Sequence, residues 1–258
     1  MKHKIVLTLL LFTGICTSCF AALEGRVSES GAVNSVVDRH TGEPVANAKV
    51  SLPKQKYSTY TDSSGGFNLD SGIKGNTLLS VEKEGYRPYS LTIDESIAAK
   101  PMALSIEKSN AHDIVLAAEL FHLGDNNFSG NSANSGEFKA DSSGPFYTKT
   151  FKMGVEALSR GNYLVVGSII GIDTLMARSL GQNKITHSYS SPPEVYFNGS
   201  KIAEISLNGD NQRIKLPNNL IRPDNINEIT LKTGKNLMQT AYVDYDDIEL
   251  MNLSVQPE

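Results

Sequence analysis

Short runs rich in Val, Ile, Leu, Tyr and Thr recur from residue 24 onward, and clusters of Gly, Asn, Asp, Ser and Pro separate them. Runs of this length between turn residues are typical of β-strands, and several alternate apolar with polar residues, which predicts one buried face. Examples are 49–52, 77–81, 194–197 and 228–231. Only 114–120 and 154–159 are also compatible with a helix. The sequence therefore predicts an all-β protein of sandwich or barrel type.

The first residues have the pattern of an export signal. Two lysines and a histidine within residues 1–4 precede an apolar run at 5–15, and small residues lead to Ala21. This pattern predicts a signal peptide over 1–21 and a location in the periplasm, at the outer membrane or outside the cell. The apolar run is too short to cross a bilayer comfortably, so we expect no transmembrane span after the signal is removed.

Both cysteines, Cys16 and Cys19, lie within this leader. Cleavage after Ala21 would leave a mature chain without disulfides, even in an oxidising compartment. Cleavage before Cys19 would instead leave a lipid-modified N-terminal cysteine. The segment 15–19 resembles a bacterial lipoprotein signal at Ser18 and departs from it at Cys16, where leucine is usual.

Length and charge narrow the organisation and the partners. A chain of 258 residues suits two modest domains or one large one, and the change of composition near 106–112 favours a boundary between 22–108 and 109–258. The formal net charge is -4, with both signs scattered along the chain. A nucleic-acid partner would call for a basic stripe or patch, so we expect none.

Three turn motifs punctuate the first part of the chain. They are Thr-Gly-Glu-Pro at 41–44, an Asp-Ser-Ser-Gly-Gly turn within 60–67, and Gly-Tyr-Arg-Pro within 83–88. In this order they resemble the carboxypeptidase regulatory-like domain, and the resemblance implies a small transthyretin-like or Ig-like sandwich over 22–108. Such domains are typically non-catalytic modules, so the resemblance implies a fold and no particular ligand.

His40 and Glu43 have the H-x-x-E spacing of a zinc pair in metallocarboxypeptidases. Catalytic zinc needs a third protein ligand and an open position for water. The chain offers no matching distal histidine, and the pair lies within the first of these turns. We therefore interpret both as turn residues.

Three pieces of the second part have a recognisable order. They are 119–130, a hairpin at 195–205 with the turn Asn198-Gly199, and a carboxylate-rich run at 242–250. In this order they resemble the galactose-binding-like jelly roll of carbohydrate-binding modules, which implies a second β-sandwich over 109–258. Many members of that family bind glycans, and others only pack against neighbouring proteins.

Carboxylates at the two ends of such a fold often share a calcium ion, which takes six to eight oxygen ligands. The resemblance implies Glu119, Asp125, Asn127 and Asp246 as metal ligands for a structural calcium. Asp247 cannot point the same way as Asp246 from a regular strand. The alternative is a solvated acidic edge that discourages sheet-to-sheet aggregation.

Glycan binding usually uses flat aromatic rings with polar groups around them. The chain has no tryptophan, but Phe146, Tyr147 and Tyr189 lie near expected loops and are candidate carbohydrate-binding residues. The alternative is that these rings supply buried area to the core or its rim.

Asp244 and Asp246 share one face of their strand and could suggest glycoside hydrolysis. No nucleophile elbow, phosphate loop or Cys/His pair accompanies them, so we expect no catalytic residue and no enzyme activity. The sequence thus favours an exported, non-catalytic carbohydrate-binding or envelope- and matrix-associated protein. An assembly protein that binds other envelope proteins and, as a weaker alternative, a glycan-active enzyme stay open.

Overall fold

The computed structural model describes residues 33–69, 72–127, 138, 141–183 and 189–258. The predicted leader at 1–21, with Cys16 and Cys19, lies outside these residues, as does most of the polar stretch 124–143. The described chain is built of β-strands with a few short helices, which confirms the all-β, β-sandwich prediction. None of the helices in the described part is long and apolar enough to span a membrane.

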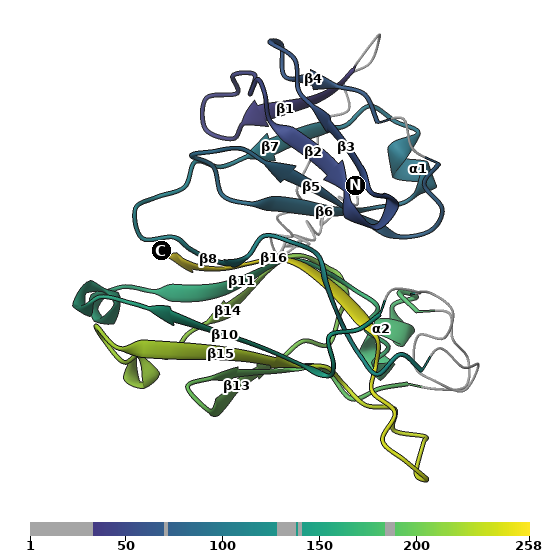
Figure 1. Cartoon of the computed structure of the whole chain (residues 1–258), viewed down its shortest axis with the longest axis vertical. Coiled ribbons are helices and arrows are strands. Elements are labelled where there is room, and N and C mark those ends of the chain that lie inside the picture. Colours follow the sequence, from purple (N-terminus) through teal and green to yellow (C-terminus); the bar gives the residue numbers. More distant parts are fainter. Residues whose placement is uncertain (1–32, 70–71, 128–137, 139–140, 184–188) are drawn as a thin grey trace, which may run out of the picture.

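The first sandwich packs a three-stranded sheet, β4-β1-β7, against a four-stranded sheet, β3-β2-β5-β6 (Figure 1). Strands β1 and β7 pair in parallel, and the other pairs are antiparallel. Alternating apolar residues of both sheets, such as Val36, Val50, Leu79 and Ile93, meet in a fully buried core. The strands are β1 Asn34–Asp38, β2 Lys49–Leu52, β3 Tyr57–Tyr60, β4 Gly66–Phe67, β5 Thr77–Glu82, β6 Tyr89–Ile93 and β7 Ala103–Ile106, with η1 Pro53–Gln55 and α1 Glu95–Ala98 between them.

The turn after β1 is held by the carboxylate of Asp38. Its Oδ1 accepts the backbone N–H groups of His40 (2.9 Å) and Thr41 (3.0 Å), and its Oδ2 accepts the hydroxyl of Tyr86 (3.0 Å). These donors, with the N–H of Thr41 foremost, lower the pKa of Asp38 to about 2. The structure thus places His40 and Glu43 in a tight turn whose ends are tied by the Asp38 N–H to the Glu43 carbonyl (2.8 Å).

The second sandwich is antiparallel throughout. Its sheets are β14-β11-β16-β8, with β9 also paired to β16, and β10-β15-β12-β13. The strands are β8 Ile114–Ala117, β9 Phe121–Leu123, β10 Phe146–Lys152, β11 Asn162–Ile170, β12 Glu194–Phe197, β13 Ser200–Glu204, β14 Gly209–Lys215, β15 Ile226–Lys232 and β16 Ile248–Pro257, with η2 Val155–Ser159, α2 Leu175–Ser179 and η3 Asn218–Leu220 between them.

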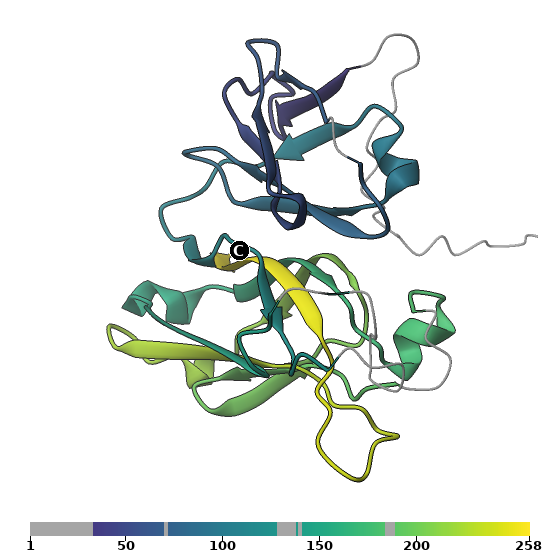
Figure 2. The same ribbon diagram turned by 45° about the vertical axis from the view of Figure 1, so that its right-hand side comes forward.

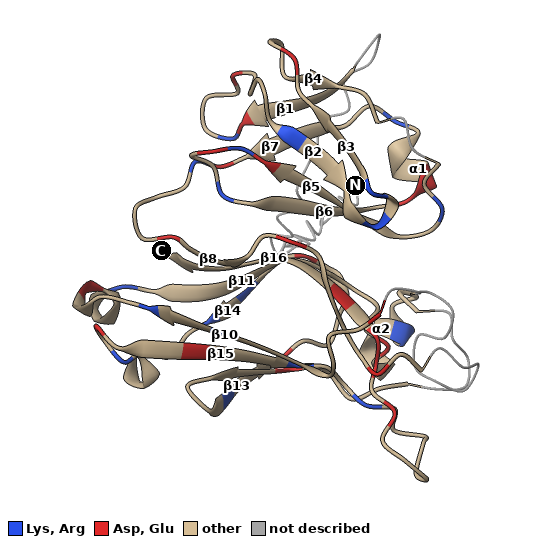
Figure 3. Cartoon of the chain, viewed as in Figure 1, with Lys and Arg blue, Asp and Glu red and all other residues tan. Residues whose placement is uncertain are grey.

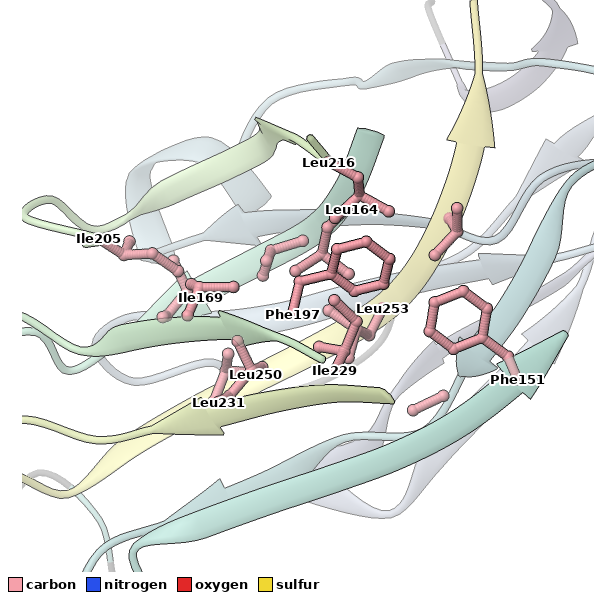
Figure 4. Close-up of a cluster of buried hydrophobic side chains, with 14 of the residues drawn as sticks. Phe151, Leu164, Ile169, Phe197, Ile205, Leu216, Ile229, Leu231, Leu250 and Leu253 are labelled. Atoms are coloured by element: carbon pink, nitrogen blue, oxygen red, sulfur yellow. The ribbon is translucent and has the colours of Figure 1, made fainter. Parts of the chain in front are cut away.

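Neither of the two helix-compatible segments forms an α-helix. Residues 114–117 form strand β8, and 155–159 form a 3-10 helix. Strand β8 pairs with β16, and this long-range pairing overrides the local preference of 114–120 for a helix. Figure 4 shows the core between the sheets, where Phe197 lies beside Leu164 and Ile229 and faces Phe151 at a ring-centroid distance of 6.4 Å.

The two sandwiches are stacked, with β6 of the first lying over β11 and β16 of the second (Figures 1 and 2). Leu78, Phe138, Ile170 and Met251 form a small buried apolar cluster in this junction. Asp210 adds polar contacts, since its carboxylate accepts the backbone N–H (3.0 Å) and the hydroxyl (2.8 Å) of Thr92. The junction therefore combines packing with directional hydrogen bonds.

Candidate functional site

One broad surface of the second sandwich presents side chains suited to ligand binding. It is the solvent side of β10-β15-β12-β13, here called the outer sheet face. Its position follows from the register, because opposed residues of antiparallel strands share a face and alternate residues along a strand return to it. The outer sheet face consists of Phe146, Thr148, Glu194, Tyr196, Lys201, Thr230 and Lys232, placed in two cross-strand rows.

Glu194 is the centre of a charged network on this face. Its carboxylate accepts hydrogen bonds from the ammonium of Lys201 (2.7 Å) and the hydroxyl of Tyr196 (2.9 Å). It also forms an ion pair with the ammonium of Lys232 at 3.3 Å. The bond from Lys201, followed by that from Tyr196, lowers the pKa of Glu194 to about 2, so the carboxylate stays ionised at neutral pH. The face is thus ordered before any ligand arrives.

Hydroxyl and aromatic groups lie beside this network. Thr148 and Thr230 face each other with their hydroxyls 2.9 Å apart. Phe146, at the end of the same strand as Thr148, has 51% of its surface exposed. An exposed ring next to hydroxyl, carboxylate and ammonium groups offers both a flat apolar surface and directional polar contacts.

The three aromatic residues proposed from the sequence lie in different environments. Phe146 is on the outer sheet face. Tyr147 points to the opposite side of β10, where it is half-buried, stacks on Phe121 at 4.1 Å, and has its pKa raised by burial. Tyr189 lies in the loop beside α2, where the guanidinium of Arg178 is 5.5 Å from its ring centre. The structure therefore does not bring the three rings together.

The sequence pattern does not by itself single out three residues of the outer sheet face, Tyr196, Thr148 and Thr230. The two-residue spacings Glu194-x-Tyr196 and Phe146-x-Thr148 are a usable signal, because they place each pair on one strand face. Which face meets solvent depends on how the sheet packs, and that information is not local.

Acidic residues gather along the chain near the start of β16, close to α2 (Figure 3). Asp125 accepts the backbone N–H groups of Asn127 (3.0 Å) and Tyr245 (2.8 Å), and the amide nitrogen of Asn127 donates to Asp244 (2.8 Å). Burial, with the nearby carboxylates of Asp244 and Asp247, raises the pKa of Asp125. Asp125, Asn127 and Asp244 therefore form one group, the first acidic group.

Asp246 and Asp247 form a second acidic group, in which the two carboxylates point in different directions. The Oδ2 of Asp246 accepts the backbone N–H of Asp173 (3.1 Å) and the hydroxyl of Ser190 (2.6 Å). Asp247 instead pairs with His122, whose Nε2 lies 2.9 Å from Oδ1 of Asp247. Both carboxylates are fully buried.

The predicted calcium ligands are divided between these places. Asp125 and Asn127 lie in the first acidic group, Asp246 in the second, and Glu119 is exposed near Tyr147, on whose phenol its charge acts. No three Asp, Glu, His or Cys side chains of the described residues are arranged to hold one metal ion. The first acidic group supplies oxygen ligands of the kind that calcium prefers, but its three side chains are too few for six to eight ligands, so the fit is partial.

Asp246 offers a pH-dependence test of the second acidic group. Burial, together with the carboxylates of Asp173 and Asp247, raises its pKa well above the ordinary value. When folding raises the pKa of an acid, its protonated form favours the folded state. This contribution to stability is complete below the unfolded pKa and is lost as pH rises through the folded pKa.

We therefore expect Asp246→Asn, which keeps an oxygen acceptor for Ser190, to raise the melting temperature at neutral and alkaline pH in calcium-free buffer. Thermal melts across a pH series measure this, with Asp141→Asn at an exposed site as the control. A variant less stable than wild type by the same margin at every pH would contradict the expectation.

Comparisons with known proteins bear mainly on the first sandwich. A search of the curated proteins gave no match. Among solved structures, a candidate carbohydrate-binding protein from Bacteroides uniformis is similar at 10% sequence identity and a TM-score of 0.21, over 87% of this chain and 97% of the other. The model of the CarboxypepD_reg-like domain family matches residues 34–116. This match covers the first sandwich and reaches the start of β8, so the first sandwich is similar to the family that the three turn motifs predict.

Proposed function

We propose that this protein is an exported, non-catalytic carbohydrate-binding protein of the cell envelope or its surroundings. In this proposal the second sandwich is a jelly roll of the galactose-binding-like kind, and its outer sheet face holds a glycan chain. The observation that carries the proposal is the juxtaposition of the exposed Phe146 ring with the Thr148–Thr230 hydroxyl pair and the Glu194 network.

A broad, ordered face suits an extended polymer better than a small molecule. Sugar rings present C–H groups on one side, which pack on aromatic faces, and hydroxyls around the edge, which exchange hydrogen bonds with hydroxyls and charged groups. The ordered Glu194 network lowers the entropy cost of binding, because its side chains are already fixed.

Retention of the protein on a set of soluble and insoluble polysaccharides tests this function. We expect at least one polymer to retain the protein. Phe146→Ala should weaken this binding about tenfold, because the ring contact is lost. Tyr60→Ala is the matched control, since Tyr60 is an aromatic residue on the first sandwich with 60% of its surface exposed. No retention on any polymer, with or without calcium, would refute the proposal.

A structural calcium at the first acidic group is part of the same proposal. We expect calcium, and not magnesium, to raise the melting temperature, because the ion would neutralise carboxylates that burial disfavours. Asp125→Ala should remove this effect, whereas Glu119→Ala should keep it if the ion lies beside Asp244. Calorimetric melts with and without a chelator measure the effect. A melting temperature that does not respond to calcium would refute a calcium site at the first acidic group.

A second function, assembly with other envelope proteins, is favoured by exposed apolar side chains on and beside α2 and on the loop 237–243. Bridges between Thr174 and Ser190 and between Ser190 and Asn236 hold the contributing loops side by side. Roughly half or more of each side chain is exposed for Leu175, Met176, Leu180, Leu237, Met238, Tyr242 and Val243. Such patches often mark protein contacts. A stoichiometric envelope protein that co-purifies with wild type and is lost on Leu237→Ser would favour this function.

A further inference from the structure

A half-open pocket of about 190 Å³ lies where the two sandwiches meet. Asn76 and Thr92 line it from the first sandwich, and Gln182, Asn183 and Asn208 line it from the second. The contacts of Asp210 with Thr92 hold β6 against β14 beside this pocket. The pocket is therefore a product of the junction, and each sandwich alone supplies only part of its wall.

The chemistry of the wall is uncharged. Its polar side chains are four carboxamides and one hydroxyl, and the rest of the lining is aliphatic or glycine, including Ile170 and Ile172. A carboxamide both donates and accepts hydrogen bonds, as a sugar hydroxyl does. A phosphate or carboxylate ligand would call for Arg or Lys in the wall, and none of the residues lining the pocket is charged.

The second-sandwich part of the wall is fixed by its own hydrogen bonds. The side chain of Asn208 accepts the N–H of Ile172 (2.7 Å) and donates to its carbonyl (3.1 Å). Gln182 accepts the N–H of Asn208 (3.0 Å) and donates to its carbonyl (3.2 Å). These bonds join three loops, so a ligand would meet a wall that needs little ordering.

We propose that this junction pocket binds one neutral, polyhydroxylated ring, such as a single hexose or the terminal unit of a glycan. The carboxamides contact hydroxyls, and the isoleucine side chains contact the C–H face of the ring. The space corresponds to about six water molecules at ~30 Å³ each, which suits one ring, so further units of a glycan would lie outside the pocket on its open side. The site is separate from the outer sheet face and does not depend on it.

Amide NMR spectra of the whole two-sandwich protein test the pocket. The probes are galactose, glucose and N-acetylglucosamine, with galacturonate and glucosamine as charged counterparts and a short galactose or glucose oligosaccharide to tell a chain end from a free sugar. We expect at least one neutral sugar to shift the signals of Gly171, Asn183 and Gly209, and the matching charged sugar to bind more weakly.

Asn76→Ala should weaken this binding about threefold to tenfold, the usual result of losing one hydrogen bond. Asn68→Ala, another exposed asparagine of the first sandwich, should leave it unchanged, and Asn183→Ala provides a second pocket variant. The proposal is overturned if no neutral sugar shifts these signals, if only charged sugars do, or if both pocket variants bind as wild type does. Phe146→Ala should retain pocket binding, so failure of the outer sheet face and failure of the pocket are distinguishable.

Discussion

Replacing Gly124 with alanine is expected to lower the free energy of unfolding by about 2–5 kcal/mol, because overpacking a buried site and separating a buried polar group from its partner each cost about 1–3 kcal/mol. A Cβ at this position would overlap the carboxylate of Asp247 and lie 3.0 Å from its Cα. Asp247 is fully buried, and its Oδ1 lies 2.9 Å from Nε2 of His122. The carboxylate therefore cannot move aside without losing its histidine partner.

Urea unfolding monitored by circular dichroism measures this loss. Gly72→Ala is the matched control, because a Cβ there would meet nothing within 4 Å, and we expect a change of at most about 0.5 kcal/mol. If Gly124→Ala is as stable as the control, the arrangement of the second acidic group around Asp247 is wrong.

Phe197→Ala is expected to cost about 3–5 kcal/mol, as for other fully buried aromatic residues. Phe197 has no exposed surface and lies between the two sheets of the second sandwich (Figure 4), where it faces Phe151. Truncation removes apolar contacts on all sides and leaves a cavity that strands on both sheets cannot close.

The same unfolding experiment separates this core position from the surface. Phe146→Ala removes an identical side chain from the same sheet, but on its exposed side, and should change stability by no more than about 0.5 kcal/mol. Similar losses for the two variants would mean that the inner and outer faces of this sheet are wrongly assigned.

Local patterns were sufficient for the fold class and for individual turns. The hairpin between β12 and β13 is an example, since Asn198 and Gly199 adopt φ angles of 50° and 83°, as a tight two-residue turn requires. The Asp38 turn is another, because its Oδ1 accepts the backbone N–H groups of His40 and Thr41, only two and three residues away. In both places the residues that define the geometry are neighbours in the sequence.

The candidate site could be predicted only in part. Alternation shows that Phe146 and Tyr147 point to opposite sides of a strand, but only the packing of β10 on the core decides which side meets solvent. The burial of Asp247 depends on His122, which lies more than a hundred residues earlier in the chain. The junction pocket depends on the docking of two sandwiches, for which no local sequence signal exists.

Strand β16 lies between β11 and β8, so the latest strand of the second sandwich is central to its sheet and not at an edge. While this segment is still being synthesised, β8 and β11 have no partner between them. The sandwich can therefore close only after Ile248–Pro257 becomes available. Completion of this sheet therefore comes late in chain synthesis, although β8 and β11 are made long before β16.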